Sequence, residues 1–419
     1  MFEKRICHAL FSRITNGGLE VTYWDGQTER YGPGPWLRLR LRTPGTVWAI
    51  ARNVDLGAGE AYVNGDIEME GDLAQFVALG AANGEQLASL LPKPLRKAPK
   101  LKLRRRNSKA KEAANIRHHY DLGNDFYRLW LDRSMTYSCA YFRTPGDSLE
   151  QAQRQKVEQI LRKLDLTPGM TLLDIGSGWG ELIVAAAKQH GAKAHGITLS
   201  HEQLRHTRER IEAEGLTDRV TVELLHYEDL PASESYDRVV SVGMYEHVGV
   251  GNHAAYMAAV ERVLRPQGVS LLHTITQTVD RPIAPFTERY IFPGGHLPTV
   301  ESILTLLPEH DFHAVDYESL RRHYARTLQE WWERFERSRD QVEEMYDERF
   351  VRMWRLYLRG AFAAFSWGKL DLAQILWTKG LSDAVPMTRD YMYRYPQPLA
   401  QAGEGEGTVS PSREATSVV

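Results

Sequence analysis

The sequence predicts an α/β fold, in which a mostly parallel sheet carries helices on both faces, preceded by a small α+β domain. Three observations predict it. From about residue 149, strand patterns alternate with amphipathic helices, as they do in doubly wound sheets. A glycine triplet directly follows the first of these strands. Residues 1–92 instead mix short strand patterns with a little helix, and a segment rich in basic residues and prolines separates the two regions.

The first region is expected to be an α+β domain over residues 1–92. Residues 36–42, WLRLRLR, alternate apolar and basic side chains, which is the period of a strand with one face in water. Residues 72–91 have helical character, with Gly80 and Gly84 as weak points. Since the chain has 419 residues, one large domain plus a smaller one is the expected organisation.

Residues 93–114 are expected to form a basic linker. Between Lys93 and Lys111 there are ten Lys or Arg residues and no acidic residue, although the whole chain has a net charge of −2. Such a run suits an anionic surface, either a membrane or a nucleic acid, and it is also typical of a solvated linker. Charge alone does not distinguish these readings.

Residues 115–395 are expected to form the main α/β domain. An amphipathic helix should begin after Ser148, which has the chemistry of an N-cap. Beyond residue 320 the sequence is expected to be largely helical and aromatic, and residues 396–419 are small, polar and expected to be disordered. The expected strands are 171–175, 193–199, 220–225, 236–243 and 269–276, and the expected helices between them are 181–190, 201–214 and 253–264.

Composition limits the class of protein. No run of 18 apolar residues occurs, so no transmembrane helix is expected. The first residues have no adequate apolar core for a signal peptide. Cys7 and Cys139 are the two cysteines of the chain, which argues against a disulfide framework or a cysteine-rich zinc site. We therefore expect a cytoplasmic enzyme without a metal site.

The central motif is LLDIGSGWGE, residues 172–181. Asp174 ends an apolar strand, a glycine triplet follows at positions 176, 178 and 180, and a helix then begins. Glycines there permit a sharp turn and a close approach of the backbone to a ligand. The GxGxG spacing after an acid differs from the GxGxxG of dinucleotide sites and resembles methyltransferase motif I, which implies S-adenosylmethionine. A tight structural turn would have the same letters.

The ends of the next two strands offer polar groups for the rest of this cofactor. Most nucleoside-binding α/β folds place an acid after the second strand to hold the ribose. Here that strand is followed by Thr198 and Gln203, so neutral groups must bind the ribose unless Glu202 turns inward. After the third strand, Tyr227 and Glu228 have the chemistry to stack on and hydrogen-bond an adenine. An ordinary helix cap and loop would also explain these residues.

Further strings extend the resemblance from about residue 115 to residue 380. The chain resembles cyclopropane-fatty-acyl-phospholipid synthases and is similar to mycolic acid cyclopropane synthases. This resemblance implies a Rossmann-like class I methyltransferase fold. It also implies transfer of a methylene group from S-adenosylmethionine to the cis double bond of unsaturated acyl chains in membrane phospholipids, through a carbocation. The strings are HYDLGNDFYRLWLD, TYSCAYF, LLDIGSGWG, GITLSHEQ, YEHVG, LLHTIT, IFPGGHLP and HYARTL.

The resemblance also implies two sets of site residues. In this family a bicarbonate ion is thought to remove the proton, and the positions that hold it fall on Cys139, Glu246, His273, Ile275 through its backbone amide, and Tyr324. The S-adenosylmethionine contacts fall on Tyr137, Ser138, Asp174, Gly176, Gly178, Thr198, Gln203, Tyr227 and Glu228. Taken alone, each of these side chains would also suit the core or the surface. The usual cysteine of the glycine loop is Ser177 here.

A carbocation needs an electron-rich surface, which aromatic rings provide. Long loops in compact domains often bind or cover ligands, so residues 291–298, IFPGGHLP, are expected to form a loop over the acyl chain. The aromatic residues suited by type to the carbocation are Tyr137, Tyr141, Phe142, Tyr290 and Phe292.

The expected partners are an unsaturated phospholipid and, through the basic linker, the anionic inner face of a membrane, to which the enzyme would associate peripherally. No nucleic-acid partner is expected, and a homodimer is left open. Two alternatives within the family chemistry are a methylene- or a methyl-branched product. More distant alternatives are a methyltransferase for a small polar acceptor and a non-enzymatic membrane- or nucleic-acid-binding protein.

Overall fold

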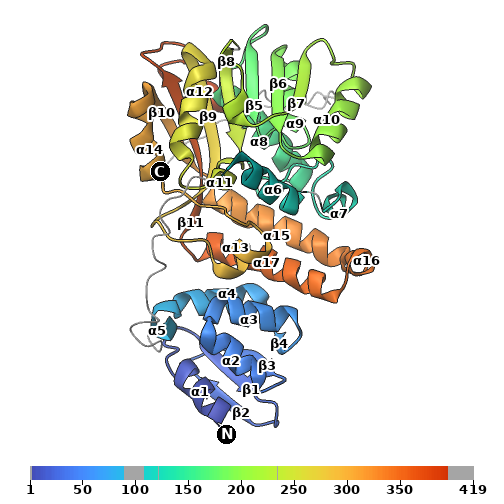
Figure 1. Cartoon of the computed structure of the whole chain (residues 1–419), viewed down its shortest axis with the longest axis vertical. Helices are drawn as coiled ribbons and strands as arrows, with labels where there is room; N and C mark the ends of the chain where they lie inside the picture. The colour runs from blue at the N-terminus through green and yellow to red at the C-terminus, as the bar shows by residue number, and fades with distance from the viewer. Residues whose placement is uncertain (1, 89–107, 121, 234, 395–419) are drawn as a thin grey trace, which may run out of the picture.

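The structure, a computed structural model, describes residues 2–88, 108–120, 122–233 and 235–394. Figure 1 shows a small N-terminal domain at one end, a large sheet with its helices at the other, and a layer of long helices between them. The expected combination of an α/β domain with a smaller α+β domain is confirmed. None of the described helices is long and apolar enough to span a membrane.

The N-terminal domain is a four-stranded sheet in the order β2-β1-β3-β4, covered by helices. The expected strand at WLRLRLR is confirmed as β3, whose leucines are buried while its tryptophan and arginines are exposed. The helix expected over 72–91 is interrupted at Asn83, whose buried side chain accepts hydrogen bonds from the backbone amides of Thr15 and Asn16. The elements are α1 Phe2–Phe11, β1 Gly18–Thr22, β2 Thr28–Tyr31, β3 Trp36–Leu41, α2 Gly45–Arg52, α3 Val54–Val63, β4 Ile67–Glu70, α4 Leu73–Ala82 and α5 Gly84–Ala88.

The expected basic linker lies mostly outside the described residues. Its last part is not a linker, because α6 (Lys109–Tyr120) begins inside it and runs through the expected boundary at residue 115. The reason is Glu112, which is buried and accepts hydrogen bonds from His226 Nε2, at 3.0 Å, and from Asn252. These contacts fix α6 to the α/β domain. The expected tail at 396–419 also lies outside the described residues.

The α/β domain contains a seven-stranded sheet in the order β10-β11-β9-β8-β5-β6-β7. The five expected strands are confirmed as its parallel part, and the expected helices separate most of them. Leu172 and Leu173 of β5 enter different hydrophobic clusters, as expected for a strand covered on both faces. The elements are α7 Asn124–Arg128, α8 Leu149–Lys163, β5 Thr171–Ile175, α9 Glu181–His190, β6 Lys193–Thr198, α10 His201–Ala213, β7 Val220–Leu224, β8 Tyr236–Val242, α11 Tyr245–Val248, α12 His253–Val263 and β9 Leu264–Gln277.

Two further strands, β10 and β11, extend the sheet at one edge. The second of them, β11, corrects the expectation of a largely helical C-terminal region. β11 (Leu370–Lys379) is antiparallel to both β9 and β10 (Phe312–Ser319). Both faces of β11 are covered, so residues 372–378 are buried without a gap. A continuous buried run lacks the alternation that identifies a strand, and by pattern alone it is indistinguishable from a buried helix.

The helices between the two domains come from the last third of the chain. α17 packs against α15 and also against α3 and α4 of the N-terminal domain (Figure 1). The Arg352 guanidinium donates to the carbonyls of Tyr62 and Ile67, and Arg359 forms an ion pair with Asp72. These helices are α13 Pro285–Tyr290, α15 Arg321–Arg337, α16 Arg339–Met345 and α17 Glu348–Ser366. The helices α14 Val300–Leu306 and α18 Asp390–Tyr393 pack instead on the α/β domain.

Candidate active site

A pocket lies at the carboxyl ends of β5, β6 and β8. The strand order reverses here, because β6 and β7 lie on one side of β5 and the next strands, β8 and β9, lie on its other side. This is where open α/β sheets bind their ligands. Glu228 follows Tyr227 in the same short 3₁₀ helix but does not line the pocket. The residues expected to contact the cofactor that do line it are Tyr137, Ser138, Asp174, Gly176, Gly178, Thr198, Gln203 and Tyr227.

The glycine loop forms a cradle with its backbone exposed to the pocket. The amides of Gly176 and Ser177 both donate to the carbonyl of Ile197, at 2.9 and 3.0 Å, which ties the loop to β6. Gly176 has a φ of +87°, and a Cβ there would lie 2.8 Å from Met244. Gly178 has a φ of +56°, and a Cβ there would meet no atom within 4 Å. The backbone therefore needs glycine, and the space beside Gly178 is open for a ligand.

Two buried polar atoms of the glycine loop lack a hydrogen-bond partner among the described residues. Asp174 Oδ1 and Ser177 Oγ are buried and have no hydrogen-bond partner within the described part of the chain. Burial raises the pKa of Asp174 to about 7, against the opposing effect of the Lys156 charge. Such groups are costly unless a ligand bonds to them. They fit the polar amino-acid part of S-adenosylmethionine.

Neutral groups line the part of the pocket next to β6. Thr198 Oγ1 donates to Gln203 Oε1 at 2.7 Å, so the two side chains hold each other in place. Glu202 does not turn inward, because its carboxylate bonds to Asn124 Nδ2, at 3.3 Å, and pairs with Arg205. Neutral hydroxyl and amide groups are thus the ones available to hold a ribose, as expected from the sequence.

Glu246 and Ile275 are the first two of the expected anion-binding residues that the structure brings together. Glu246 lies on α11, directly after β8, and its Oε1 accepts the backbone amide of Ile275 on β9 at 2.6 Å. This amide was expected to hold the anion, but the structure commits it to Glu246. Burial raises the pKa of Glu246 to about 7, although the Ile275 amide opposes the rise. The other oxygen, Oε2, is buried without a partner among the described residues.

His273 lies two residues before Ile275, so both side chains point to the same face of β9. Its Nδ1 is 3.1 Å from the amide nitrogen of Gln374 on β11. Because that amide nitrogen donates, Nδ1 accepts and the ring proton is on Nε2. Burial, together with the charges of Lys156 and Lys163, holds the pKa of His273 well below its usual range. The residue is thus a neutral imidazole whose buried Nε2–H has no partner in the described chain.

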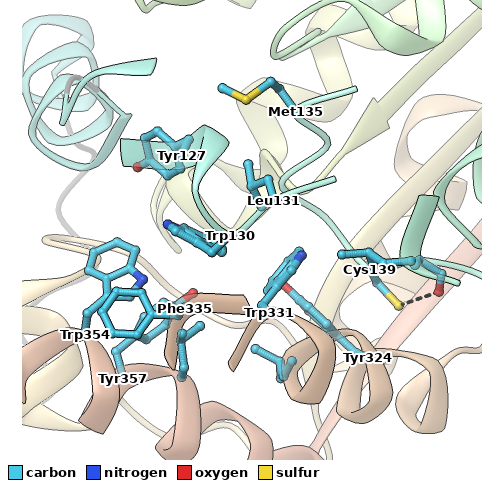
Figure 2. Close-up of a cluster of buried hydrophobic side chains, with 14 of the residues drawn as sticks. Tyr127, Trp130, Leu131, Met135, Cys139, Tyr324, Trp331, Phe335, Trp354 and Tyr357 are labelled. Atoms are coloured by element: carbon cyan, nitrogen blue, oxygen red, sulfur yellow. Dashed lines mark hydrogen bonds between the residues drawn. The ribbon is translucent and has the colours of Figure 1, made fainter. Parts of the chain in front are cut away.

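Cys139 and Tyr324 lie at one end of a large aromatic cluster (Figure 2). The Cys139 thiol donates to the carbonyl of Ala140 at 3.3 Å, and burial raises the pKa of this thiol, which stays protonated. Tyr324, on α15, is buried against the Phe365 ring. Ile275 packs against the same cluster. The five expected residues come from four separate segments of the chain: Cys139, Tyr324 and Ile275 share this cluster, and Glu246 accepts the Ile275 amide.

The rings that form the centre of this cluster differ in part from those expected. Tyr137 lies 5.2 Å from both Trp130 and Trp331 between ring centroids, and its hydroxyl is 2.7 Å from that of Tyr357. Phe292 contacts Tyr357 at 5.8 Å. The two tryptophans and Tyr357 were not predicted, because aromatic residues at such spacing are indistinguishable from ordinary core.

Three of the expected aromatic residues have other roles. Tyr141 stacks on His323, and Phe142 lies under the Arg326 guanidinium at 4.0 Å. Tyr290 belongs to the contact with the N-terminal domain and donates to a glutamate there. Phe142 belongs to the cluster and Tyr141 and Tyr290 pack against it, so their role toward a carbocation stays a prediction.

His247 and Lys156 are among the pocket residues that were not predicted, and Lys156 had a signal in the sequence. His247 follows Glu246, lines the pocket, and has its pKa lowered to about 4 by burial. Lys156 also lines the pocket and is 3% exposed. It lies four residues before the buried Ile160, so helical spacing already put it on the apolar face of its helix. A lysine on that face is uncommon unless it is paired.

The expected loop after α13 is confirmed, and it lies against α11. Its His296 amide donates to the carbonyl of Glu246 at 2.9 Å, and its Phe292 ring is 5.6 Å from His247. The loop therefore covers the segment that carries the buried carboxylate. Its contact with an acyl chain stays a prediction.

Known proteins match most of the chain. The family described as mycolic acid cyclopropane synthetase matches residues 107–375, and a domain of unknown function matches residues 6–89. A relative named "Probable fatty acid methyltransferase", from Pseudomonas putida, is 40% identical over 385 residues, which are 90% of this chain and 96% of the relative. The cyclopropane-fatty-acyl-phospholipid synthase of Escherichia coli (strain K12) is 38% identical over 355 residues, which are 84% of this chain and 90% of that protein.

A solved structure supports the same assignment for the α/β domain. Mycolic acid cyclopropane synthase CmaA1, complexed with SAH and CTAB, is 34% identical, with a TM-score of 0.61. The match covers 64% of this chain and 98% of that structure. The glycine cradle and the unsatisfied polar atoms agree with this comparison. The chain belongs to the mycolic acid cyclopropane synthetase family and is an S-adenosylmethionine-dependent methyltransferase with the class I fold.

Proposed function

We propose that this methyltransferase converts the cis double bonds of unsaturated acyl chains in membrane phospholipids into cyclopropane rings. The name of the E. coli relative, which matches over most of both chains, supports the acyl-phospholipid substrate. The observations that carry the proposal are two buried unsatisfied atoms, Glu246 Oε2 and His273 Nε2, and the aromatic cluster against which Ile275 packs. A methyltransferase for a small polar acceptor would have no need for such an apolar surface.

The proposed reaction depends more on how the site positions the substrate and excludes water than on any single catalytic group. A carbon of the double bond attacks the methyl group as the carbon–sulfur bond breaks, and S-adenosylhomocysteine leaves. The acyl chain then carries a carbocation, and loss of a proton from the new methyl group closes the ring. An olefin is a weak nucleophile, so positioning and exclusion of water must supply much of the rate. The rings of Tyr137, Trp130 and Trp331 offer the cation their electron-rich faces.

The proton acceptor in this proposal is a bicarbonate ion held by the chain's own buried groups. Bicarbonate supplies a small base that can enter an apolar site where a charged side chain is costly. The His273 Nε2–H is a donor and Glu246 Oε2 is an acceptor, and both are unsatisfied within the described residues. This donor and acceptor set fits an ion that has both a negative oxygen and a hydroxyl group. With its pKa near 7, Glu246 can also exchange a proton with that ion.

A second outcome of the same chemistry is an acyl chain with a methyl or methylene branch. The observation that favours it is the 40% identical relative, which is named as a fatty acid methyltransferase. The product depends on which proton the carbocation loses. It therefore depends on where the base lies relative to the new methyl group, and not on the cofactor pocket.

Access to the lipid is proposed to involve the basic run at residues 93–111. It precedes the α/β domain and would be attracted to the anionic inner face of a membrane. The enzyme would then act as a peripheral protein on the cytoplasmic side. A homodimer remains compatible with this arrangement.

The test is incubation of the full-length protein with S-adenosylmethionine and vesicles of unsaturated phospholipid. Acyl chains are then released and identified by mass spectrometry and proton NMR, which separates a ring from a methylene branch. We expect cyclopropane acyl chains, and their loss in Glu246→Gln. Methylated acyl chains without a ring would establish the second outcome. A lack of any lipid product, with turnover of a small polar acceptor, would overturn the proposal.

A further inference from the structure

Helix α8 has a buried lysine on the wall of the cofactor pocket that the mechanism above does not use. Lys156 is 3% exposed, and its ammonium donates to Ser138 Oγ at 3.1 Å. An ammonium group has three donors. Ser138 is its one hydrogen-bond partner in the described part of the chain, so two donors remain for another group. Burial lowers the pKa of Lys156, against the attraction of nearby acids.

The nearby acids attract the Lys156 ammonium, but none forms an ion pair with it in the described part of the chain, so they do not account for its two remaining donors. Asp132 accepts hydrogen bonds from Ser134 and from the Thr136 amide, and Glu181 pairs with Arg210 at 2.7 Å. Each of these two carboxylates therefore already has partners. Asp174, the third acid, lines the pocket with Oδ1 unsatisfied, and no ion pair joins it to Lys156 within the described chain.

Another lysine on the same helix shows what a structural buried lysine looks like here. Lys163 is completely buried, and its ammonium pairs with Glu318 at 2.6 Å and with Asp316 at 3.7 Å. Burying an ammonium group is expensive unless an opposite charge compensates it. Lys163 has two such charges from the protein, whereas Lys156 instead faces the space that the cofactor occupies.

A structural role in holding residues 136–138 does not explain the buried charge of Lys156 either. Gln153, one turn earlier on α8, donates from Nε2 to the carbonyls of Thr136 and Ser138, at 3.2 and 2.9 Å. These two bonds already fix the backbone of the segment that enters the pocket. A charged group at position 156 adds something that the amide does not, which is an attraction for an anion.

We propose that Lys156, together with the Ser138 hydroxyl, binds the α-carboxylate of S-adenosylmethionine. The amino-acid part of this cofactor has one carboxylate and one ammonium group. Among the described residues that line the pocket, Lys156 is the one lysine or arginine and Asp174 has an unsatisfied carboxyl oxygen, so the two complement this zwitterion. The inference depends on the cofactor, and it does not depend on the lipid chemistry proposed above.

The experiment compares three probes by calorimetric titration of the full-length protein. They are S-adenosylhomocysteine, its decarboxylated analogue, and methylthioadenosine, which lacks the whole amino-acid part. The wild-type protein is expected to bind S-adenosylhomocysteine about 10- to 100-fold more tightly than the decarboxylated analogue, the usual range for a hydrogen bond to a charged group. Lys156→Met is expected to bring this ratio close to one without changing the affinity for methylthioadenosine.

A matched control separates carboxylate binding from support of the loop. Gln153→Leu loosens the same segment but leaves the Lys156 charge in place. It is expected to weaken S-adenosylhomocysteine and the decarboxylated analogue by the same factor, so that the ratio stays as in the wild type. Lys156→Gln provides a second uncharged variant if the methionine variant does not fold.

The wild-type protein alone can overturn the inference. Equal affinity for S-adenosylhomocysteine and its decarboxylated analogue would show that no group in the protein binds the carboxylate. A wild-type ratio that persists in Lys156→Met would place that role on another residue and would also overturn it. Failure of the wild-type protein to bind S-adenosylhomocysteine at all would instead contradict the cofactor assignment, so the two failures are distinguishable.

Discussion

Replacement of Glu246 by glutamine is expected to make the protein more stable at alkaline pH while removing its activity. Glu246 is buried, and its Oε1 accepts the Ile275 amide at 2.6 Å. A glutamine can keep that hydrogen bond through its amide oxygen, because the two side chains have nearly the same shape. What the substitution removes is the buried negative charge and the ability to exchange a proton.

The magnitude follows from the pKa of Glu246, which burial raises from 4.5 to about 7. The folded state therefore binds the proton more tightly than the unfolded state between these two values. Stability is thus highest below about pH 4.5, falls as the pH rises through 7, and is then constant. At about 1.4 kcal/mol per pKa unit, the ionised carboxylate costs the folded protein about 3 kcal/mol above pH 7.

The assay is urea denaturation of wild type and Glu246→Gln across a pH series. We expect the variant to be more stable by about 3 kcal/mol near pH 8.5, and the difference to shrink toward zero near pH 4.5. The difference between the two proteins is needed because Asp174 also has its pKa raised to about 7 and contributes the same trend to both. Glu309→Gln, at an exposed glutamate, is the control for the substitution itself. A stability difference that does not change with pH would refute the reasoning.

The remaining predictions concern the cofactor, the base and the membrane. Gly178→Val should abolish S-adenosylmethionine binding, because its side chain would enter the open space beside a φ of +56°; wild-type affinity in calorimetric titration would contradict this. Rigorous removal of bicarbonate should slow product formation and its return should restore the rate, so unchanged turnover in carbonate-free buffer would exclude bicarbonate as the base. Neutralising Arg104, Arg105 and Arg106 should weaken co-sedimentation with anionic vesicles by about a hundredfold at low salt, since each basic residue is worth about 1 kcal/mol there. Cofactor affinity should not change, and vesicle binding equal to wild type would favour a simple linker.

Local patterns predicted strands that alternate between buried and exposed residues, and short apolar strands that are followed by glycines. The strand at residues 171–175 is short, apolar and followed by glycines, and the strand at 36–41 alternates cleanly. The strand at 370–379 is twice as long as β5 and does not alternate, because residues 372–378 are buried without a gap, so its pattern is also that of a buried helix. The start of α6 was missed for a different reason. Its stability comes from Glu112, whose partners lie more than a hundred residues away in the sequence.

The cofactor loop could be inferred from spacing, but the candidate catalytic residues could not. The acid and the glycines of the loop all lie within residues 174–180, so a single segment of sequence carries the signal. Cys139, Glu246, His273 and Tyr324 come from four segments, so no single stretch of sequence carries their signal. Resemblance to a family supplied those positions. It did not supply the Ile275 amide's actual partner, which depends on the orientation of one side chain.

The N-terminal domain contributes to the position of the loop that covers Glu246. Asp55 of α3 accepts the Phe286 amide at the start of α13, at 3.0 Å, and the loop that follows donates its His296 amide to the Glu246 carbonyl. The fit is close, since a Cβ at Gly59 would lie 2.5 Å from the Phe286 ring. One short helix is thus held at its start by one domain and leads at its end to the backbone of the proposed active site. A movement of the loop that keeps both contacts must therefore hinge between Phe286 and His296.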